Sequence, residues 1–135
     1  MGSRPAIVLD AHVWTWWTHD PDRLAASQIQ TIREHETDIP GVGAVSVWEI
    51  ARLAEHNRLE FPGGIDDWLR QALSCPGIRP MGLSAEIAVE STRLSGEFHR
   101  DPADQIIVAT ARDHGVPLVS SGRKIIAYPH VATVS

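Results

Sequence analysis

Short apolar runs alternate along the chain with segments in which apolar residues recur every three or four positions. The first run, Ala6 to Leu9, is continuous and has the length of a strand, and similar runs occupy 42–45, 78–83 and 116–119. Between these runs, the apolar residues recur at the spacing of three or four positions that is typical of amphipathic helices. It predicts the following helices: one that includes residues 13–17, then 24–35, 46–56, 65–73, 84–94 and 101–114. Strands and helices are therefore expected to alternate.

This alternation predicts an α/β protein with a central parallel sheet that helices cover on both faces. Buried parallel strands are expected to read as continuous apolar runs, as they do here. Local signals support the boundaries: Ser84 is a helix cap, Gly115 ends the last helix, and Pro76-Gly77 is a turn. Pro80 weakens the strand prediction at 78–83. A chain of 135 residues fits one domain, which we assign to 1–135.

Composition narrows the class of protein. Apolar residues make up 43% of the chain and charged residues 21%, and no apolar run approaches the ~18 residues that span a bilayer. No secretory signal is evident, so we expect a cytoplasmic protein without a membrane partner. Cys75 is the only cysteine, which excludes an intrachain disulfide, and no zinc-type Cys/His spacing occurs. The net charge of −5 argues against a general nucleic-acid coat protein.

Acidic residues follow the predicted strands. Asp10 comes directly after the first strand, Glu49 lies one turn beyond the second, and Asp101 and Asp104 open the helix at 101–114. Ligands of open parallel sheets bind at the carboxyl ends of the strands, so we expect these four acids to converge. Two carboxylates ~4 Å apart repel by about 4 kcal/mol at an effective dielectric near 20. A divalent cation removes that cost, and oxygen-only ligation favours Mg²⁺ or Mn²⁺.

Each acid also has a purely structural interpretation, and the sequence leaves these interpretations open. Asp10 is placed to be the N-cap of the first helix. Ser46 and Glu49 match a capping box, in which Glu49 would only satisfy backbone amides. Asp101 could cap the helix that Pro102 begins.

Taken together, three segments resemble the signature blocks of PIN-domain ribonucleases, and more narrowly the VapC toxins of bacterial type II toxin–antitoxin pairs. They are VLDAHVW at 8–14, SVWEIA at 46–51 and HRDPADQIIVATA at 99–111. The resemblance covers about residues 7 to 130. It implies a Rossmann-like three-layer α/β/α fold, metal-dependent endonuclease cleavage of RNA and a cognate antitoxin. By position it makes Asp10 and Asp104 the principal metal ligands and catalytic acids, with Glu49 completing the site and Asp101 as an additional acid.

One position departs from the family pattern. Members usually carry another Asp after the last core strand, where this chain has Ser120-Ser121-Gly122. Gly122 removes a carboxylate, which puts a second metal in doubt, although the two serines could hydrogen-bond a water at the site. The departure motivates a rival hypothesis, a PIN-like domain that has lost catalysis and binds RNA or a partner protein. A phosphotransfer receiver is a third hypothesis, which the position of Lys124, the only lysine, disfavours.

Basic and aromatic residues complete the picture. Arg100, Arg123 and Lys124 flank the acids in sequence and could contact RNA phosphates or could be solvated surface charges. His12 and His99 also flank the acids, and a structural or RNA-contacting role is expected for them. We expect the five tryptophans to lie mostly in the core or on a partner surface. An aromatic patch near the first two helices would suit a homodimer, which we expect, or an antitoxin interface.

Overall fold

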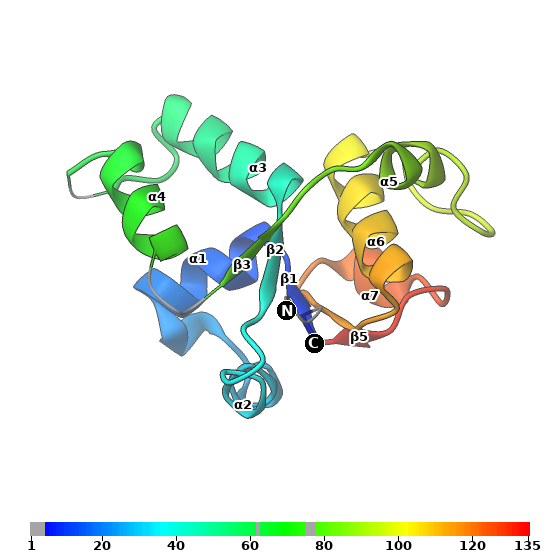
Figure 1. Ribbon diagram of the computed structural model, residues 1–135, viewed down its shortest axis with the longest axis horizontal. Coiled ribbons are helices and arrows are strands. Elements are labelled where there is room, and N and C mark those ends of the chain that lie inside the picture. The colour runs from blue at the N-terminus through cyan, green and yellow to red at the C-terminus, as the bar shows by residue number, and fades with distance from the viewer. Residues whose placement is uncertain (1–4, 62, 75–77) are drawn as a thin grey trace.

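A five-stranded, entirely parallel sheet forms the centre of the protein (Figure 1). The computed structural model describes residues 5–61, 63–74 and 78–135. The strands lie in the order β3-β2-β1-β4-β5. Their bounds are β1 Val8–Leu9, β2 Gly41–Gly43, β3 Arg79–Met81, β4 Leu118–Val119 and β5 Thr133–Val134. The chain proceeds outward from β1 first toward β3 and later toward β5, so a topological switch point lies between β1 and β4.

Helices cover both faces of the sheet. In Figure 1 helices α1 and α4 lie on the left and α5, α6 and α7 on the right, while α2 lies below the strands and α3 runs across the top. Their bounds are α1 Ala11–His19, α2 Ala26–Glu34, α3 Ala44–Glu55, α4 Ile65–Ser74, α5 Ala85–Glu90, α6 Pro102–His114 and α7 Arg123–Ala127, with a short 3₁₀ helix, η1, at Pro21–Arg23. The arrangement has the three α/β/α layers that the sequence predicts.

Two hydrophobic cores flank the sheet because successive strand residues point to opposite faces. Leu9 and Val119 pack with Trp14 of α1 in one core. Val8 and Leu118 pack with the helix α6 in the other. All four strand residues are completely buried. The continuous apolar runs in the sequence therefore mark strands that are covered on both sides.

The predicted order of elements is confirmed, but most boundaries differ from the prediction. The strands β1, β3 and β4 are shorter than the apolar runs at 6–9, 78–83 and 116–119, β2 ends at Gly43 rather than at 45, and α2 begins at Ala26 rather than Leu24. Helix α3 begins at Ala44 rather than Ser46, since Gly43 already adopts the extended N-cap conformation and Val45 is helical. Helix α5 ends at Glu90 rather than at 94. The elements η1, α7 and β5 were missed because each is too short to show a periodic pattern. The turn predicted at Pro76-Gly77 lies outside the described residues.

Pro80 is compatible with a strand because β3 is at the edge of the sheet and pairs only with β2. Within the described residues, none of the helices combines the length and apolar composition that crossing a bilayer requires.

Candidate active site

The carboxyl ends of β1 and β4 lie side by side. Leu9 is in register with Val119, and the Asp10 amide donates to the Val119 carbonyl at 3.1 Å. Asp10 is therefore held next to Ser120, at the switch point of the sheet. Only 8% of the Asp10 surface is exposed. This position puts a nearly buried carboxylate at the edge where parallel sheets bind ligands.

Asp10 is also the N-cap of α1. Its Oδ1 accepts a hydrogen bond from the Val13 amide at 2.9 Å. Hydrogen bonds with the Ser120 hydroxyl and the Ser121 amide favour the ionised form, but burial outweighs them and raises the pKa of the Asp10 carboxyl. The capping interpretation of Asp10 is thus correct, and it fixes the orientation of the side chain.

Glu49 reaches the site from the second turn of α3. Because the helix begins at Ala44, Ser46 is its third residue and Gly43 is the N-cap, so the capping-box interpretation of Ser46 and Glu49 was wrong. Ser46 is completely buried instead. Glu49 caps no helix and is half-buried.

The first turn of α6 supplies the remaining two acids. Asp101 is the N-cap, and its Oδ1 accepts from the Asp104 amide at 3.1 Å. The Asp104 carboxylate is half-buried, and its Oδ2 lies 2.8 Å from Nε2 of His99. This contact is an ion pair when the imidazole is protonated. His99 therefore lies against one of the acids.

All four acids line one hollow of about 490 Å³. The residues around it are Asp10, Ala11, His12, Trp16, Glu49, Asp101, Asp104, Ile107, Ser121, Gly122 and Ile125. Three segments that lie far apart in the sequence supply the carboxylates. The structure thus brings together the acids that the sequence suggested.

The acids oppose one another's ionisation. Burial raises the pKa of Glu49 to about 7, with further contributions from the charges of Asp104, Asp10 and Asp101. Burial also raises the pKa of Asp104, and the charge of Asp101 adds to this while His99 counteracts it. Perturbed carboxyls that share a hollow are typical of functional sites.

The donor set suits a hard divalent cation, because carboxylate oxygens crowd the hollow and a cation would offset their repulsion. Across residues 5–61, 63–74 and 78–135, however, no group of three His, Cys, Asp or Glu side chains is close enough to hold a metal ion. Asp104 is drawn toward His99. Ligation by three of the acids would therefore require side-chain rotation.

The other predicted site residues differ in how close they lie to the acidic hollow. Ser121 and Gly122 line the acidic hollow. Ser120 is completely buried, and its hydroxyl accepts from the Gly122 amide at 3.0 Å. Arg123 and Lys124 follow directly in the first turn of α7 and are exposed.

Arg100 is exposed and lines a different hollow, which includes Ser91 and Gln105. The structure does not bring Arg100 into the acidic hollow.

Sequence reasoning missed Gln28. This side chain is 2% exposed, and its Nε2 donates to the Ser120 carbonyl at 3.2 Å and to the Ser121 hydroxyl at 3.0 Å. Its Oε1 accepts from the Ala25 amide at 2.9 Å. Gln28 therefore ties α2 to the loop beside Asp10. A signal was present, because Gln28 lies midway between the apolar Leu24 and Ile32 on one face of the predicted helix.

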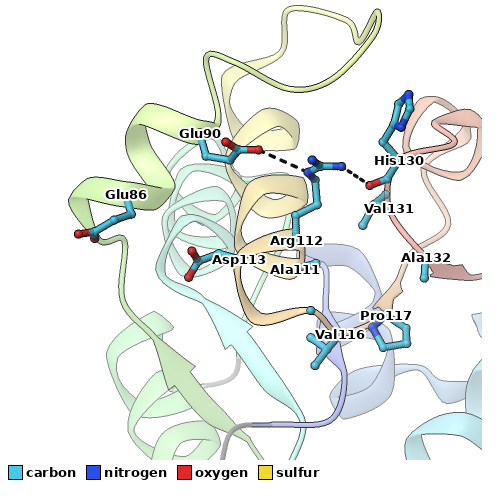
Figure 2. A pocket seen from close by; sticks show the side chains of 11 residues that line it. Glu86, Glu90, Ala111, Arg112, Asp113, Val116, Pro117, His130, Val131 and Ala132 are labelled. Carbon is cyan, nitrogen blue, oxygen red and sulfur yellow. Dashed lines mark hydrogen bonds and ion pairs between the residues drawn. The ribbon is translucent and has the colours of Figure 1, made fainter.

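The larger hollow in Figure 2, of about 820 Å³, lies at the opposite edge of the sheet, near Pro117 where β4 begins. Its main polar feature is Arg112, whose Nε lies 3.5 Å from Glu90 and whose guanidinium donates to the His130 carbonyl (Figure 2). These contacts tie α6 to α5 and to the C-terminal segment. Glu86, Glu90 and Asp113 also line this hollow, but Glu90 is paired with Arg112, and we assign the hollow a structural role.

A parallel sheet with carboxylates gathered at its switch point is what PIN domains are expected to have, and the sequence model of the PIN domain matches residues 7–131. The chain belongs to the PIN domain family. Among curated proteins it is similar to Ribonuclease VapC22 of Mycobacterium tuberculosis, with 35% identity over 129 residues that cover 96% of each chain.

Solved structures have the same fold at low sequence identity. VapBC2 from Rickettsia felis, bound to a DNA fragment from its promoter, matches with a TM-score of 0.70 at 12% identity, over 94% of this chain and 96% of that one. FitAcB from Neisseria gonorrhoeae matches with a TM-score of 0.68 at 16% identity, over 96% of both chains. These matches confirm the Rossmann-like α/β/α fold that the resemblance implied.

Proposed function

We propose that this protein is a metal-dependent endoribonuclease and the toxin of a toxin–antitoxin pair. The observation that carries the proposal is the convergence of Asp10, Glu49, Asp101 and Asp104 on one hollow. The likeness to a protein named Ribonuclease VapC22 supports RNA as the substrate class. Both the family and the crowding of carboxylates favour a divalent cation, Mg²⁺ or Mn²⁺, as cofactor.

Asp10, Glu49 and Asp104 would hold the cation. Its chemistry, when bound, would be to neutralise charge on the scissile phosphate and to lower the pKa of a water molecule. Asp10 is oriented in advance by its bond to the Val13 amide, and Gln28 holds the adjoining loop in place. Asp101 uses one oxygen to cap α6, so its proposed contribution is chiefly negative charge at the rim.

Glu49 should make metal binding at this site depend on pH. With a pKa near 7, it carries a proton in about half of the molecules at neutral pH, and cation binding would expel that proton. Metal affinity should therefore rise between about pH 6 and 8.

Basic and polar side chains near the acidic hollow are the proposed contacts to RNA. Arg123 and Lys124 are proposed to contact phosphates, since they directly follow Gly122 at the rim of the hollow. Arg100 has weaker support because it lines another hollow. Ser121 faces the acids and is proposed to hydrogen-bond a water near the phosphate.

A cognate antitoxin is the proposed protein partner. Support comes from structures with the same fold, VapBC2 of Rickettsia felis and a toxin-antitoxin complex from Klebsiella pneumoniae that matches with a TM-score of 0.64 at 19% identity, over 96% of both chains. We also propose a homodimer.

The test is cleavage of RNA with Mg²⁺ or Mn²⁺ and with chelator. Asp10→Asn keeps an equally good helix cap and removes the charge, and Asp104→Asn removes the second proposed ligand. Asp113→Asn, an exposed position near the other end of α6, is the matched control. We expect cleavage by the wild-type and Asp113→Asn proteins that chelator abolishes, and at least a hundredfold loss in the other two variants. Undiminished cleavage by Asp10→Asn would remove the proposal.

Gly122 favours one second candidate, a PIN domain that binds RNA without cutting it. The position lines the hollow and carries no carboxylate. Calorimetric titration separates the two functions, because negligible affinity at millimolar Mg²⁺ with retained RNA binding would favour the binding function.

A further inference from the structure

A second hollow, of about 800 Å³, adjoins the acidic one. His12, Glu49 and Asp101 line both. Beyond these shared residues the character changes from acidic to aromatic and basic, and the remaining lining residues are Trp48, Arg52, Leu53, His56, Arg58, Pro102 and Ala103. A chain lying in this second hollow would lead directly to the carboxylates.

Trp48 is the most exposed large hydrophobic side chain in the part of the chain that the structure describes, at 52%. It immediately precedes Glu49 on α3, so its place relative to the acids is fixed by the helix. The Arg52 guanidinium lies 5.1 Å from the centre of the Trp48 ring, one turn along the helix. An aromatic ring with a cation beside it is the combination that single-stranded nucleic acids bind by stacking and charge.

The end of α3 adds a second cation. Asn57 has a left-handed backbone with φ of 56°, and the Arg58 amide then donates to the Leu53 carbonyl at 2.8 Å. This turn closes the helix and brings Arg58 back to the hollow that Arg52 lines. Two arginines therefore line this hollow, and its acids, Glu49 and Asp101, are the ones that it shares with the acidic hollow.

We propose that this second hollow binds the single-stranded RNA that flanks the scissile phosphate, with a base stacked on Trp48 and with Arg52 and Arg58 at its phosphates. The inference rests on the proposed nuclease function and assigns the path of its substrate. RNA is favoured over a peptide because the cations and the ring continue directly into the proposed catalytic acids. Arg123 and Lys124 then lie beyond Gly122, outside this second hollow.

The experiment measures binding of a mixed-sequence, single-stranded RNA of about twelve nucleotides, with Mg²⁺, in the uncut Asp10→Asn background. Trp48→Ala should weaken binding roughly 5- to 150-fold, the range found for a base stacked on an aromatic side chain, and Trp48→Phe should restore part of it. The dependence on salt separates stacking from charge. Trp48→Ala should leave the slope of log K against log salt unchanged, whereas Arg52→Ala should reduce it by about 0.7 per lost phosphate.

Matched controls are Val89→Ala, another exposed apolar residue, and Arg33→Ala, an exposed arginine on α2. Both should bind RNA as the parent does. Equal affinity of the Trp48→Ala variant and its parent would overturn the inference, and so would a change in sedimentation or in antitoxin affinity without a change in RNA affinity. Failure of the nuclease proposal is recognised separately, because it is the absence of metal-dependent cleavage by the wild-type chain.

Discussion

Replacing Glu49 with glutamine tests whether burial and the neighbouring acids together disfavour the ionised Glu49 carboxylate in the folded protein. Raising the pKa of this carboxyl from 4.5 to about 7 corresponds to about 3.4 kcal/mol of folding free energy at alkaline pH, at about 1.36 kcal/mol per tenfold change in affinity for the proton. Glu49 is half-buried, and solvent screening reduces this figure. We therefore expect Glu49→Gln to be more stable than the wild type by about 1–2 kcal/mol at pH 8.

The sign of the effect depends on pH. A carboxyl whose pKa is higher in the folded state gives its full stabilisation below the pKa of the unfolded chain, and this stabilisation is lost as the pH rises through the folded value. The advantage of Glu49→Gln should accordingly be small at pH 5, grow between about 5 and 7, and remain constant above pH 8. Since the charges of Asp104 and Asp10 help to raise the pKa of Glu49, the difference in stability belongs to the coupled set of acids rather than to Glu49 alone.

The assay is urea unfolding of both proteins from pH 5 to 8.5 without divalent cations. Glu55→Gln, an exposed position on the same helix, is the control and should give no comparable pH-dependent gain. Added Mg²⁺ should stabilise the wild type more than Glu49→Gln and so reduce the difference in unfolding free energy between the two proteins. If the difference in unfolding free energy between Glu49→Gln and the wild type does not change across this pH range, the reasoning is refuted.

Three further substitutions follow from the same geometry. Gly122→Asp should tighten Mn²⁺ binding measured by calorimetry, because it adds a carboxylate to the lining of the acidic hollow. The backbone accepts the side chain, since φ is −73° and an added Cβ would make only ordinary contacts of 3.4 Å or more. Unchanged affinity would mean that this position does not face the cation. Gln28→Ala should lose about 1–3 kcal/mol in thermal unfolding and slow cleavage, because the Ser120 and Ser121 loop loses its partner; wild-type stability would refute this role. Asp10→Ala should be about 0.5–2 kcal/mol less stable than Asp10→Asn in urea, because only asparagine retains the cap on α1.

The sequence predicted the elements with long apolar signals and missed those defined by tertiary contacts. Strand β1 and helix α6 were recognised because burial on both faces and a full helical period leave clear patterns. Strand β5, at Thr133–Val134, has two half-buried residues and exists because it pairs with β4. Such pairing over distance has no local signal.

The sequence likewise predicted only part of the candidate site. The acids were identified because Asp10, Asp101 and Asp104 stand at element boundaries, where ligands and caps both occur. The start of α3 was misplaced by two residues because Val45 suits a strand as well as a helix, and this error made Glu49 look like a capping residue. The contact between His99 and Asp104 depends on the path of the loop before α6, which no local pattern specifies.

The central claim is that carboxylates from three separate parts of the chain jointly bind a divalent cation. Its most direct test is titration with Mn²⁺ at pH 7.5, followed by electron paramagnetic resonance of the free ion, for the wild type and Asp10→Asn. The account predicts saturable binding to the wild type and at least a tenfold weaker affinity in the variant. Equal binding by both proteins, or none by the wild type at millimolar Mn²⁺, would contradict it.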